Sequence, residues 1–338
     1  MAAALALAVF VAIPFVEVEV PGVFQSALNR PGTLQLLALC LTFAGVALSY
    51  NLLFGYTGLL SFGHALYFAA GVYLPCVAMT RWHWSLPAAI ALTSVVGLLL
   101  PLLLGSISLR VGGIAFAMVT LAFAQAGSIL VFKNPARLTG GEEGLGLDVG
   151  HLPDSLVGIV NTANLYWIAL LYLVVVFASC WWAVGSRPGR VLQAIRENEK
   201  RVEVMGLRPY TYKLFAFTLS GFLATGGGFV YLLLIGGATP AVTTANFSLA
   251  LLLMVVLGGA GTLWGPMVGG MLYEYLDFRL LKLSASGTVD SLPAVLKVPL
   301  SEPLFILGVL FIVLVYFFPG GIAGFIGRLS RVRAPGSR

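Results

Sequence analysis

Charged side chains are scarce in this sequence, because Asp, Glu, Lys and Arg make up 9% of the 338 residues while 59% are hydrophobic. A soluble domain carries roughly 25% charged residues, so this composition excludes the soluble globular classes. Apolar stretches recur along the whole chain, and several exceed the roughly 20 residues that cross a bilayer as a helix. The predicted fold class is therefore all-α: one polytopic transmembrane helical bundle over residues 1–338, with about 8–10 spans.

Acidic residues are missing where a self-powered carrier would need them. The apolar stretches 33–80, 86–109 and 113–132 contain no Asp or Glu, and Glu274 and Asp277 are the acidic residues in or near a later span. Carriers that are coupled to protons or cations usually bury a carboxylate inside the bundle. A transporter without one is either a passive channel or takes its energy from a partner.

Nucleotide, catalytic and metal motifs are also absent from the sequence. No GxxxxGK[ST] segment is present, and the glycine-rich GGAGTLWG lacks the phosphate-binding lysine. There is no HExxH, EF-hand or nucleophile-elbow pattern, and the three cysteines lie in apolar stretches without CxxC spacing, at positions 40, 76 and 180. We therefore expect no catalytic residue, cofactor site or metal site on this chain, and a membrane enzyme is the least supported class.

The basic residues are concentrated in particular segments rather than spread over a soluble face. The net charge is +6, and segment 187–213 holds seven of the nineteen Lys and Arg residues. The tail beyond Phe325 adds four arginines. Such clusters mark cytoplasmic segments of membrane proteins, so they predict contact with membrane lipid and a cytoplasmic C-terminus rather than nucleic-acid binding. Loop 133–164, one span upstream of 187–213, is then an outer loop.

Two cytoplasmic segments must be joined by an even number of crossings. The apolar block 246–276 lies between them and is too long for a single untilted pass, so it must break near the glycines at 258–265. The predicted spans are 2–16 (an uncleaved first span), 33–54, 62–80, 86–104, 113–132, 165–183, 213–235, 246–258, 265–281 and 303–318.

A similar glycine-rich break lies in the first half of the chain. Segments NLLFGYTGLLSFGH (51–64) and MVVLGGAGTLWGP (254–266) align at an offset of 203 residues. Paired Gly-interrupted segments point to a translocation path, although glycines also allow ordinary close helix packing. His64 in turn either faces the path or hydrogen-bonds a neighbouring helix. The candidate path residues are Gly55, Gly58, Ser61, Gly63, His64, Gly258, Gly261 and Gly265.

Segment 187–213 predicts a cytoplasmic amphipathic helix. Pro188 suits a first turn, Gly206 suits a helix stop, and an apolar stripe combines Leu192, Ile195, Val202 and Met205. The segment is either a solvated loop helix that enforces topology or a helix that docks into a groove on a soluble partner.

Together these segments resemble the LivM-type inner-membrane permeases of bacterial branched-chain amino acid ABC transporters, over about residues 33–320. The motifs that carry the resemblance are NLLFGYTGLLSFGHALYFAAGVY (51–73), RVGGIAFAMVTLAFAQ (110–125), LTGGEEGLGL (138–147), GRVLQAIRENEKRVEVMGLRPYTYKLFAF (189–217) and LLLMVVLGGAGTLWGPMVGG (251–270). The LTGGxxGL loop favours the LivM-like branch over its LivH-like companion.

This resemblance implies that 187–212 is a coupling-helix loop that engages an ATPase subunit. The chain keeps the expected glycine at Gly206 but has Arg201, Val202, Glu203 and Val204 where alanines are usual. The implied coupling residues are Arg196, Glu197, Glu199, Glu203, Met205 and Gly206.

The resemblance also implies the partners of the chain. These are two ATP-binding cassette subunits that carry ATP and Mg²⁺, a second LivH-like permease, and a periplasmic substrate-binding protein that meets outer loops 133–164 and 236–246. The cargo would be branched-chain amino acids, and related permeases leave open urea, short amides or sugars. The remaining alternative is a carrier or channel that works alone.

Overall fold

The computed structural model describes residues 8–18, 27–158, 161–284, 303–317 and 320–325, and confirms the predicted all-α class. Part of the first predicted span, residues 2–7, lies outside the described residues. The long helices are α2 (Pro31–Asn51), extended by a π-helical turn over Leu52–Thr57, α3 (His64–Thr80), α4 (Leu86–Ser108), α5 (Gly113–Lys133), α6 (Thr162–Gly185), α9 (Pro209–Ile235), α10 (Ala245–Gly258), α11 (Gly265–Ser284) and α14 (Pro303–Phe317).

Each predicted span from 33 to 318 coincides with one of these helices. The predicted break in the block 246–276 is confirmed, because α10 ends at Gly258 and α11 begins at Gly265. Within the part of the chain that the structure describes, five helices are long and apolar enough to cross a membrane, while α3 and α10 are shorter apolar helices. The 14 residues of α10 extend only about 21 Å, which is less than the roughly 30 Å of a bilayer core.

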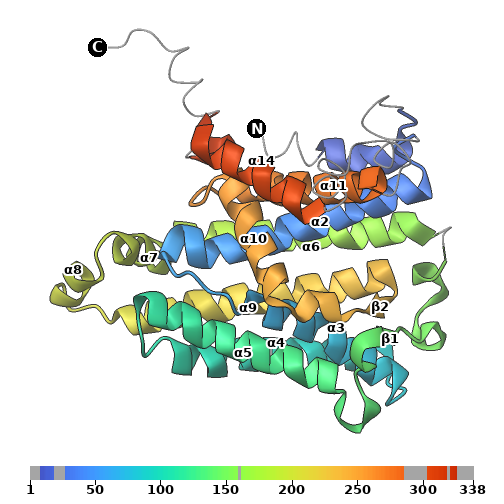
Figure 1. Ribbon diagram of the computed structural model, residues 1–338, viewed down its shortest axis with the longest axis horizontal. Helices are drawn as coiled ribbons and strands as arrows, with labels where there is room; N and C mark the ends of the chain where they lie inside the picture. The colour runs from blue at the N-terminus through green and yellow to red at the C-terminus, as the bar shows by residue number, and fades with distance from the viewer. Residues whose placement is uncertain (1–7, 19–26, 159–160, 285–302, 318–319, 326–338) are drawn as a thin grey trace, which may run out of the picture.

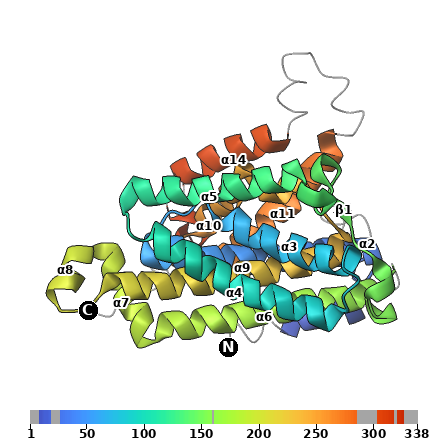
Figure 2. The ribbon, with the colours of Figure 1, turned by 90° about the horizontal axis from the view of Figure 1, so that it is seen from below.

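Helices α2, α4, α5, α6 and α9 run roughly side by side along the long axis (Figures 1 and 2), whereas α10 runs across them (Figure 1). α2 is central and packs against α6, α9 and α11, while α9 also packs against α3 and α4. Glycines allow the closest approach: a Cβ atom on Gly228 of α9 would lie 3.0 Å from the Cα of Gly71 of α3. Because lipid gives helices no hydrophobic reason to associate, such backbone approach and dispersion contacts hold the bundle together.

One end of the bundle, which we call the strand end, is built from the connections after α3, α5 and α9. Two short strands, β1 (Leu145–Gly146) and β2 (Gly237–Ala238), pair antiparallel and so join the two predicted outer loops. Thr80 at the end of α3 donates to the Gly146 carbonyl at 3.2 Å. The remaining short helical turns are η1 (Ile13–Phe15) near the N-terminus, and η3 (Pro135–Arg137), η4 (Gly141–Glu143), η5 (Val149–His151), η6 (Asp154–Leu156) and η8 (Pro240–Thr243) at this end.

The opposite end carries an arm that projects from the bundle between α6 and α9 (Figure 1). The arm consists of α7 (Arg187–Glu197) and α8 (Glu199–Val204) followed by residues 205–208. The prediction of a single helix over this segment is wrong, because the chain turns at Asn198, whose backbone is extended. The Asn198 side chain caps α8 by accepting a hydrogen bond from the Arg201 amide at 3.0 Å. A side-chain oxygen in this position satisfies an amide that has no partner within the helix.

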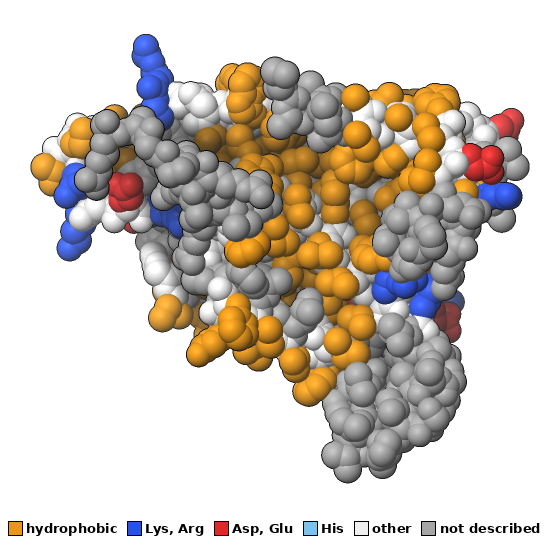
Figure 3. Space-filling model, turned by 90° about the horizontal axis from the view of Figure 1, so that it is seen from above, with side chains coloured by type: hydrophobic (Ala, Val, Ile, Leu, Met, Phe, Trp, Pro, Cys, Tyr) orange, Lys and Arg blue, Asp and Glu red, His pale blue; other side chains and the backbone are white. Residues whose placement is uncertain are grey.

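Between the two ends, exposed hydrophobic side chains cover much of the surface. Figure 3 shows them concentrated between two groups of charged residues at opposite edges of the face in view. α4 illustrates the pattern, because Val95, Leu99 and Leu103 on this helix are exposed. An apolar belt flanked by charged ends is the surface expected of a bundle surrounded by lipid.

Candidate functional site

The first break, residues 52–63, begins with the π-helical turn at the end of α2. Leu59 donates its amide hydrogen to the Leu53 carbonyl at 3.0 Å, and the Thr57 hydroxyl donates to the Leu52 carbonyl at 2.9 Å. This wider turn shifts the hydrogen-bond register, and Gly58 then ends the helix with a φ of +75°. Single π-helical turns of this kind are frequent at functional sites.

The non-helical part of the first break is held by side chains from other helices. The Tyr50 hydroxyl donates to the Ser61 carbonyl at 2.9 Å, and the Ser248 hydroxyl donates to the Phe62 carbonyl at 2.7 Å. The amide of Phe62 donates to the Thr120 hydroxyl oxygen at 3.2 Å. Irregular backbone inside a membrane bundle is tolerated where protein groups satisfy it in this way.

The second break, residues 259–264, is in direct contact with the first. Asn51 at the end of α2 donates from Nδ2 to the Thr262 carbonyl at 2.8 Å, and its Oδ1 accepts from the Gly261 amide at 2.9 Å. A Cβ atom on Gly55 would lie 2.5 Å from the Gly261 nitrogen. The two breaks, more than 200 residues apart in sequence, therefore form one structural unit.

Arg196 on α7 covers this unit from the arm. Its Nη1 atom donates to the carbonyl of Gly55, and a Cβ atom on Gly261 would lie 2.9 Å from the same nitrogen. A Cβ atom on Gly58 would lie 3.1 Å from the Arg196 Cγ. Sequence analysis assigned Arg196 to the ATPase-facing surface, whereas the structure places its side chain against both breaks.

The structure brings the predicted path residues together around this unit. Gly58 is exposed and Gly261 is half-buried, while Gly55, Ser61, Gly63, Gly258 and Gly265 are buried. Their role in translocation stays a prediction, because the chain encloses most of them in this conformation.

His64 is fully buried beside the first break. Its Nε2 lies 3.3 Å from the Ser49 hydroxyl, and its ring contacts Tyr50 and Tyr67 edge-on, with centroids 5.0 and 6.1 Å away. Its Nδ1 atom has no hydrogen-bond partner within the described part of the chain. Of the two predicted roles, the contact with Ser49 supports hydrogen bonding to a neighbouring helix.

The predicted apolar stripe on the arm is divided by the turn at Asn198. Leu192, Ile195 and Val202 are buried against the bundle, so these three side chains are not available to a soluble partner. The placement of Met205 in that stripe is wrong, because its side chain is 73% exposed at the outer tip beside Val204, which is 88% exposed.

The charged residues of the arm do not all face outward. Glu199 forms an ion pair with Lys213 of α9, with 2.5 Å between the carboxylate and the ammonium nitrogen. Glu197 and Glu203 are exposed, and Gly206 follows α8 with a φ of +81°. All six predicted coupling residues are exposed; Arg196 and Glu199 also contact the bundle, whereas Glu197, Glu203, Met205 and Gly206 lie on the free surface of the arm.

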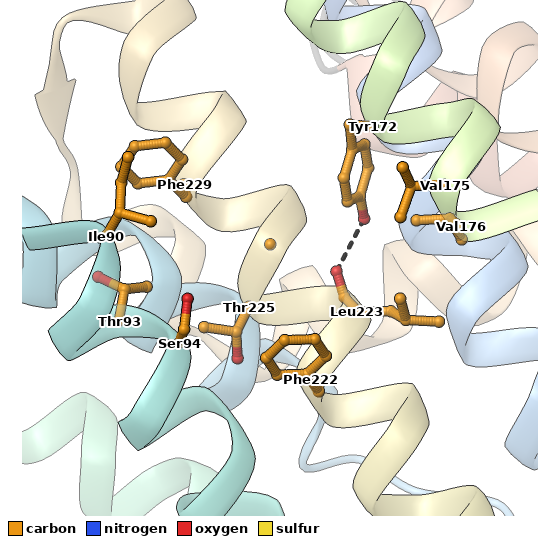
Figure 4. Close-up of a pocket in the computed structure, with 11 residues that line it drawn as sticks. Ile90, Thr93, Ser94, Tyr172, Val175, Val176, Phe222, Leu223, Thr225 and Phe229 are labelled. Carbon is orange, nitrogen blue, oxygen red and sulfur yellow. Dashed lines mark hydrogen bonds between the residues drawn. The ribbon is translucent and has the colours of Figure 1, made fainter. Parts of the chain in front are cut away.

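A cavity of about 160 Å³ lies between α4, α6 and α9, away from both breaks (Figure 4). Its walls are mainly apolar, including Ile90, Val176 and Phe229, and the Tyr172 hydroxyl donates to the Leu223 carbonyl at 2.9 Å. The Thr225 hydroxyl is also engaged, because it lies within hydrogen-bonding distance of the Tyr67 and Gly221 carbonyls. A zwitterionic solute, such as the amino acid cargo that the sequence resemblance implies, needs charged or strongly polar partners, and this mainly apolar lining does not provide them.

Several residues at the candidate site were not predicted from the sequence. Asn51, Thr262, Thr120 and Ser248 supply the polar contacts that hold the breaks, and Val204 forms the tip of the arm. Asn51 offered a usable signal, because it is a lone amide directly before the first break in an otherwise apolar segment. The others could not be found without knowing which helices meet.

Comparison with known proteins identifies relatives over most of the chain. The chain is similar to the high-affinity branched-chain amino acid transport system permease protein LivM of Escherichia coli (strain K12), with 26% identity over 263 residues. That match covers 71% of this chain and 62% of the relative, so the chain spans less than two thirds of the relative's length. The probable branched-chain amino acid transport permease protein LivM of Methanocaldococcus jannaschii is 25% identical over 317 residues, covering 82% of this chain and 89% of that protein.

A more distant similarity links the chain to sugar permeases. The ribose import permease protein RbsC of Haemophilus influenzae is 26% identical over 126 residues, which cover 36% of this chain and 39% of that protein. No solved structure matches the chain significantly. Residues 32–315 match the family described as "Branched-chain amino acid transport system / permease component", and the chain therefore belongs to this family of ABC transport permeases.

Proposed function

We propose that this chain is one permease half of an ATP-driven importer that carries branched-chain amino acids across the bacterial inner membrane. Two such halves, this chain and a LivH-like permease, would enclose the path, and a periplasmic binding protein would deliver the cargo. ATP is hydrolysed on two separate ATPase subunits, and the present chain performs no covalent chemistry. The family match and the LivM-like relatives support this proposal.

The observation that carries the proposal is the exposed apolar tip of the arm. Val204 and Met205 are 88% and 73% exposed and are surrounded by charged residues such as Lys200 and Glu203. A methionine and a branched aliphatic side chain at the end of a short helix are suited to a hydrophobic groove on a soluble partner. We therefore assign the ATPase contact to this tip, with Glu197, Glu203 and Gly206 beside it.

The charge distribution supports a cytoplasmic location for the arm end. This end carries Arg110 together with the seven Lys and Arg residues of 187–213. The connection between α5 and α6 at the strand end carries Glu142, Glu143, Asp148 and Asp154 against Lys133 and Arg137. Positively charged loops stay on the cytoplasmic side, so the arm would meet the ATPases there and the strand end would meet the binding protein.

The two breaks would then form the cytoplasmic gate of the path. They lie at the arm end, half of their residues are buried, and they are in contact with each other. In the proposed cycle, ATP binding moves the arms, the helices rock, and the two breaks move together out of the path to release cargo inside. This mechanism needs no intramembrane carboxylate, since the energy enters through the arm.

The test is retention of ATPase subunits by the purified transporter. Val204→Asp or Met205→Asp places a charge in the proposed apolar contact, so the ATPases should be lost from the complex at unchanged membrane abundance. Val111→Asp is a matched control, because Val111 is exposed on the turn after α4 at the same end. Normal ATPase retention in both tip variants would refute the proposed contact.

The cargo is tested with the complete transporter in proteoliposomes. Uptake of labelled L-leucine should require ATP inside the compartment that faces the arm, and competition with urea and ribose distinguishes the alternative cargoes. The ribose permease relative makes this competition necessary. Uphill uptake by the purified chain alone would instead identify a carrier that works without ATPases.

A further inference from the structure

We propose that Arg196 is a positioning residue that transmits movement of the arm to both breaks, with Asn51 joining the second break to the first. This inference rests on the proposed function, because it assumes that the arm receives movement from an ATPase. It differs from the sequence expectation, in which Arg196 contacts the ATPase itself. The set formed by Arg196, Gly55, Asn51 and Gly261 is called the bridge below.

The carbonyl of Gly55 is available because of the π-helical turn. The last carbonyls of a helix have no partner within it, and the amide of Leu59 donates to Leu53 rather than to Gly55. Arg196 supplies the missing donor from a different element of the chain. A guanidinium is suited to this role, since its planar group donates in several directions from one fixed position.

The bridge continues from the first break to the second through two hydrogen bonds of Asn51 and a close backbone contact between Gly55 and Gly261. Asn51 uses both ends of its amide, one for the Thr262 carbonyl and the other for the Gly261 amide. The Gly55 backbone is close enough to Gly261 that a Cβ atom would not fit between them. A displacement of Arg196 therefore moves both breaks together.

The remaining described contacts of the arm are apolar contacts with the first break and α9, and one ion pair with α9. Leu192 and Ile195 pack in an apolar cluster with Leu52 and Leu53 of the first break and with residues of α9, and Glu199 pairs with Lys213 of α9. Apolar contacts can slide, whereas a hydrogen bond fixes the distance between two named atoms. Arg196 is thus the polar connection by which the arm holds the first break in register.

The experiment compares Arg196→Ala with Arg190→Ala in the complete transporter. Both changes remove an arginine side chain from α7, and Arg190 is exposed on the same helix. We expect Arg196→Ala to retain the ATPases and their ATP hydrolysis while leucine uptake falls about 10-fold, a coupling loss of ordinary size. Arg196→Lys, which keeps one donor, should recover part of the uptake, and Arg190→Ala should match the wild type.

A second readout does not depend on the cargo. Spin labels at Lys200→Cys on the arm and Trp264→Cys in the second break report the distance between them, and both native residues are exposed. With Arg196 present, this distance should have one narrow distribution with and without ATP. In the Arg196→Ala background, the distance distribution should broaden and change on ATP binding, because the arm then moves without the second break.

The outcomes separate the two proposals. Loss of the ATPases from Arg196→Ala would mean that Arg196 contacts the ATPase directly, and it would overturn the inference. Unchanged leucine uptake together with an unchanged spin-label distance distribution would also overturn it. If Arg196→Ala does not accumulate, Arg196→Gln and Arg196→Lys undergo the same two measurements and decide the matter. The proposed function fails separately, when the unmodified complex contains no ATPases or takes up no leucine.

Discussion

Asn51 and Gly261 are 210 positions apart, yet the Gly261 amide donates to Asn51 Oδ1 at 2.9 Å. The Nδ2 atom of the same Asn51 side chain donates to the Thr262 carbonyl at 2.8 Å. One side chain thereby satisfies two backbone groups of a non-helical segment. Neither backbone group belongs to a helical ladder, so Asn51 supplies each with a partner and stabilises the contact between the breaks.

Replacing Asn51 with Leu should therefore destabilise the folded protein. The leucine has similar volume but removes the Asn51 partner of the Gly261 amide and of the Thr262 carbonyl; because Gly261 and Thr262 are half-buried, we expect a total cost of about 1–3 kcal/mol. Thermal unfolding of the purified protein in detergent measures this as a lower midpoint. Gln35→Leu is the control, because the Gln35 amide makes a single described hydrogen bond, to the Leu234 carbonyl. Equal midpoints for Asn51→Leu and the wild type would contradict the structural role.

The ion pair between Glu199 and Lys213 predicts an asymmetric effect of mutation. The Lys213 side chain is 11% exposed and that of Glu199 is 46% exposed. Glu199→Ala leaves a buried ammonium without a partner, so it should cost more stability than Lys213→Met, which leaves an exposed carboxylate. We expect a difference of about 1 kcal/mol, given the exposure of Glu199.

A double-mutant cycle in thermal unfolding checks this prediction. Glu199→Ala should have almost no effect in the Lys213→Met background, because the pair is already absent. Glu197→Ala, on the same arm and exposed, serves as the control for removing a carboxylate. Additive effects of the two changes would show that the pair contributes nothing measurable.

Gly206 is expected to control the direction in which the arm tip points. Its φ of +81° is unfavourable for a β-branched residue, although no atom lies within 4 Å of an added Cβ. Gly206→Val should therefore act through backbone strain, about 1–3 kcal/mol, and rotate the segment after α8. ATP hydrolysis should then continue while uptake by the complete transporter falls.

Gly206→Asn is the matched variant, because asparagine tolerates the left-handed conformation better than other residues. It should retain most of the uptake. Unchanged uptake in Gly206→Val at normal membrane abundance would remove Gly206 from the coupling machinery.

The different burial of residues in the two breaks predicts how fast cysteines placed there react with a maleimide. Ser61 is fully buried, whereas Trp264 in the second break is 41% exposed. A membrane-impermeant maleimide applied at the arm end should label Trp264→Cys rapidly and Ser61→Cys slowly when ATP is absent. Labelling of Ser61→Cys should accelerate with ATP if the two breaks move out of the path as proposed.

The three native cysteines are buried and free, so they contribute little background. Rapid labelling of Ser61→Cys without ATP would mean that this part of the first break is open in the resting state.

The amino-acid sequence alone located the apolar helices and the positions of both breaks. Hydrophobic run length decides the crossings, because a bilayer of fixed thickness requires a minimum apolar length. Parity of crossings then required the division of 246–276, which the structure places between Gly258 and Gly265. These properties are local and follow from composition and chain length.

Only the tertiary structure decided which residues meet. Arg196 looked like one more charge on an amphipathic segment, and its contact with Gly55 depends on how α7 folds back after α6. Met205 fitted the apolar periodicity, yet the turn at Asn198 places it outside. Such contacts join positions far apart in sequence, and the small residues that permit them carry no directional pattern that a sequence can reveal.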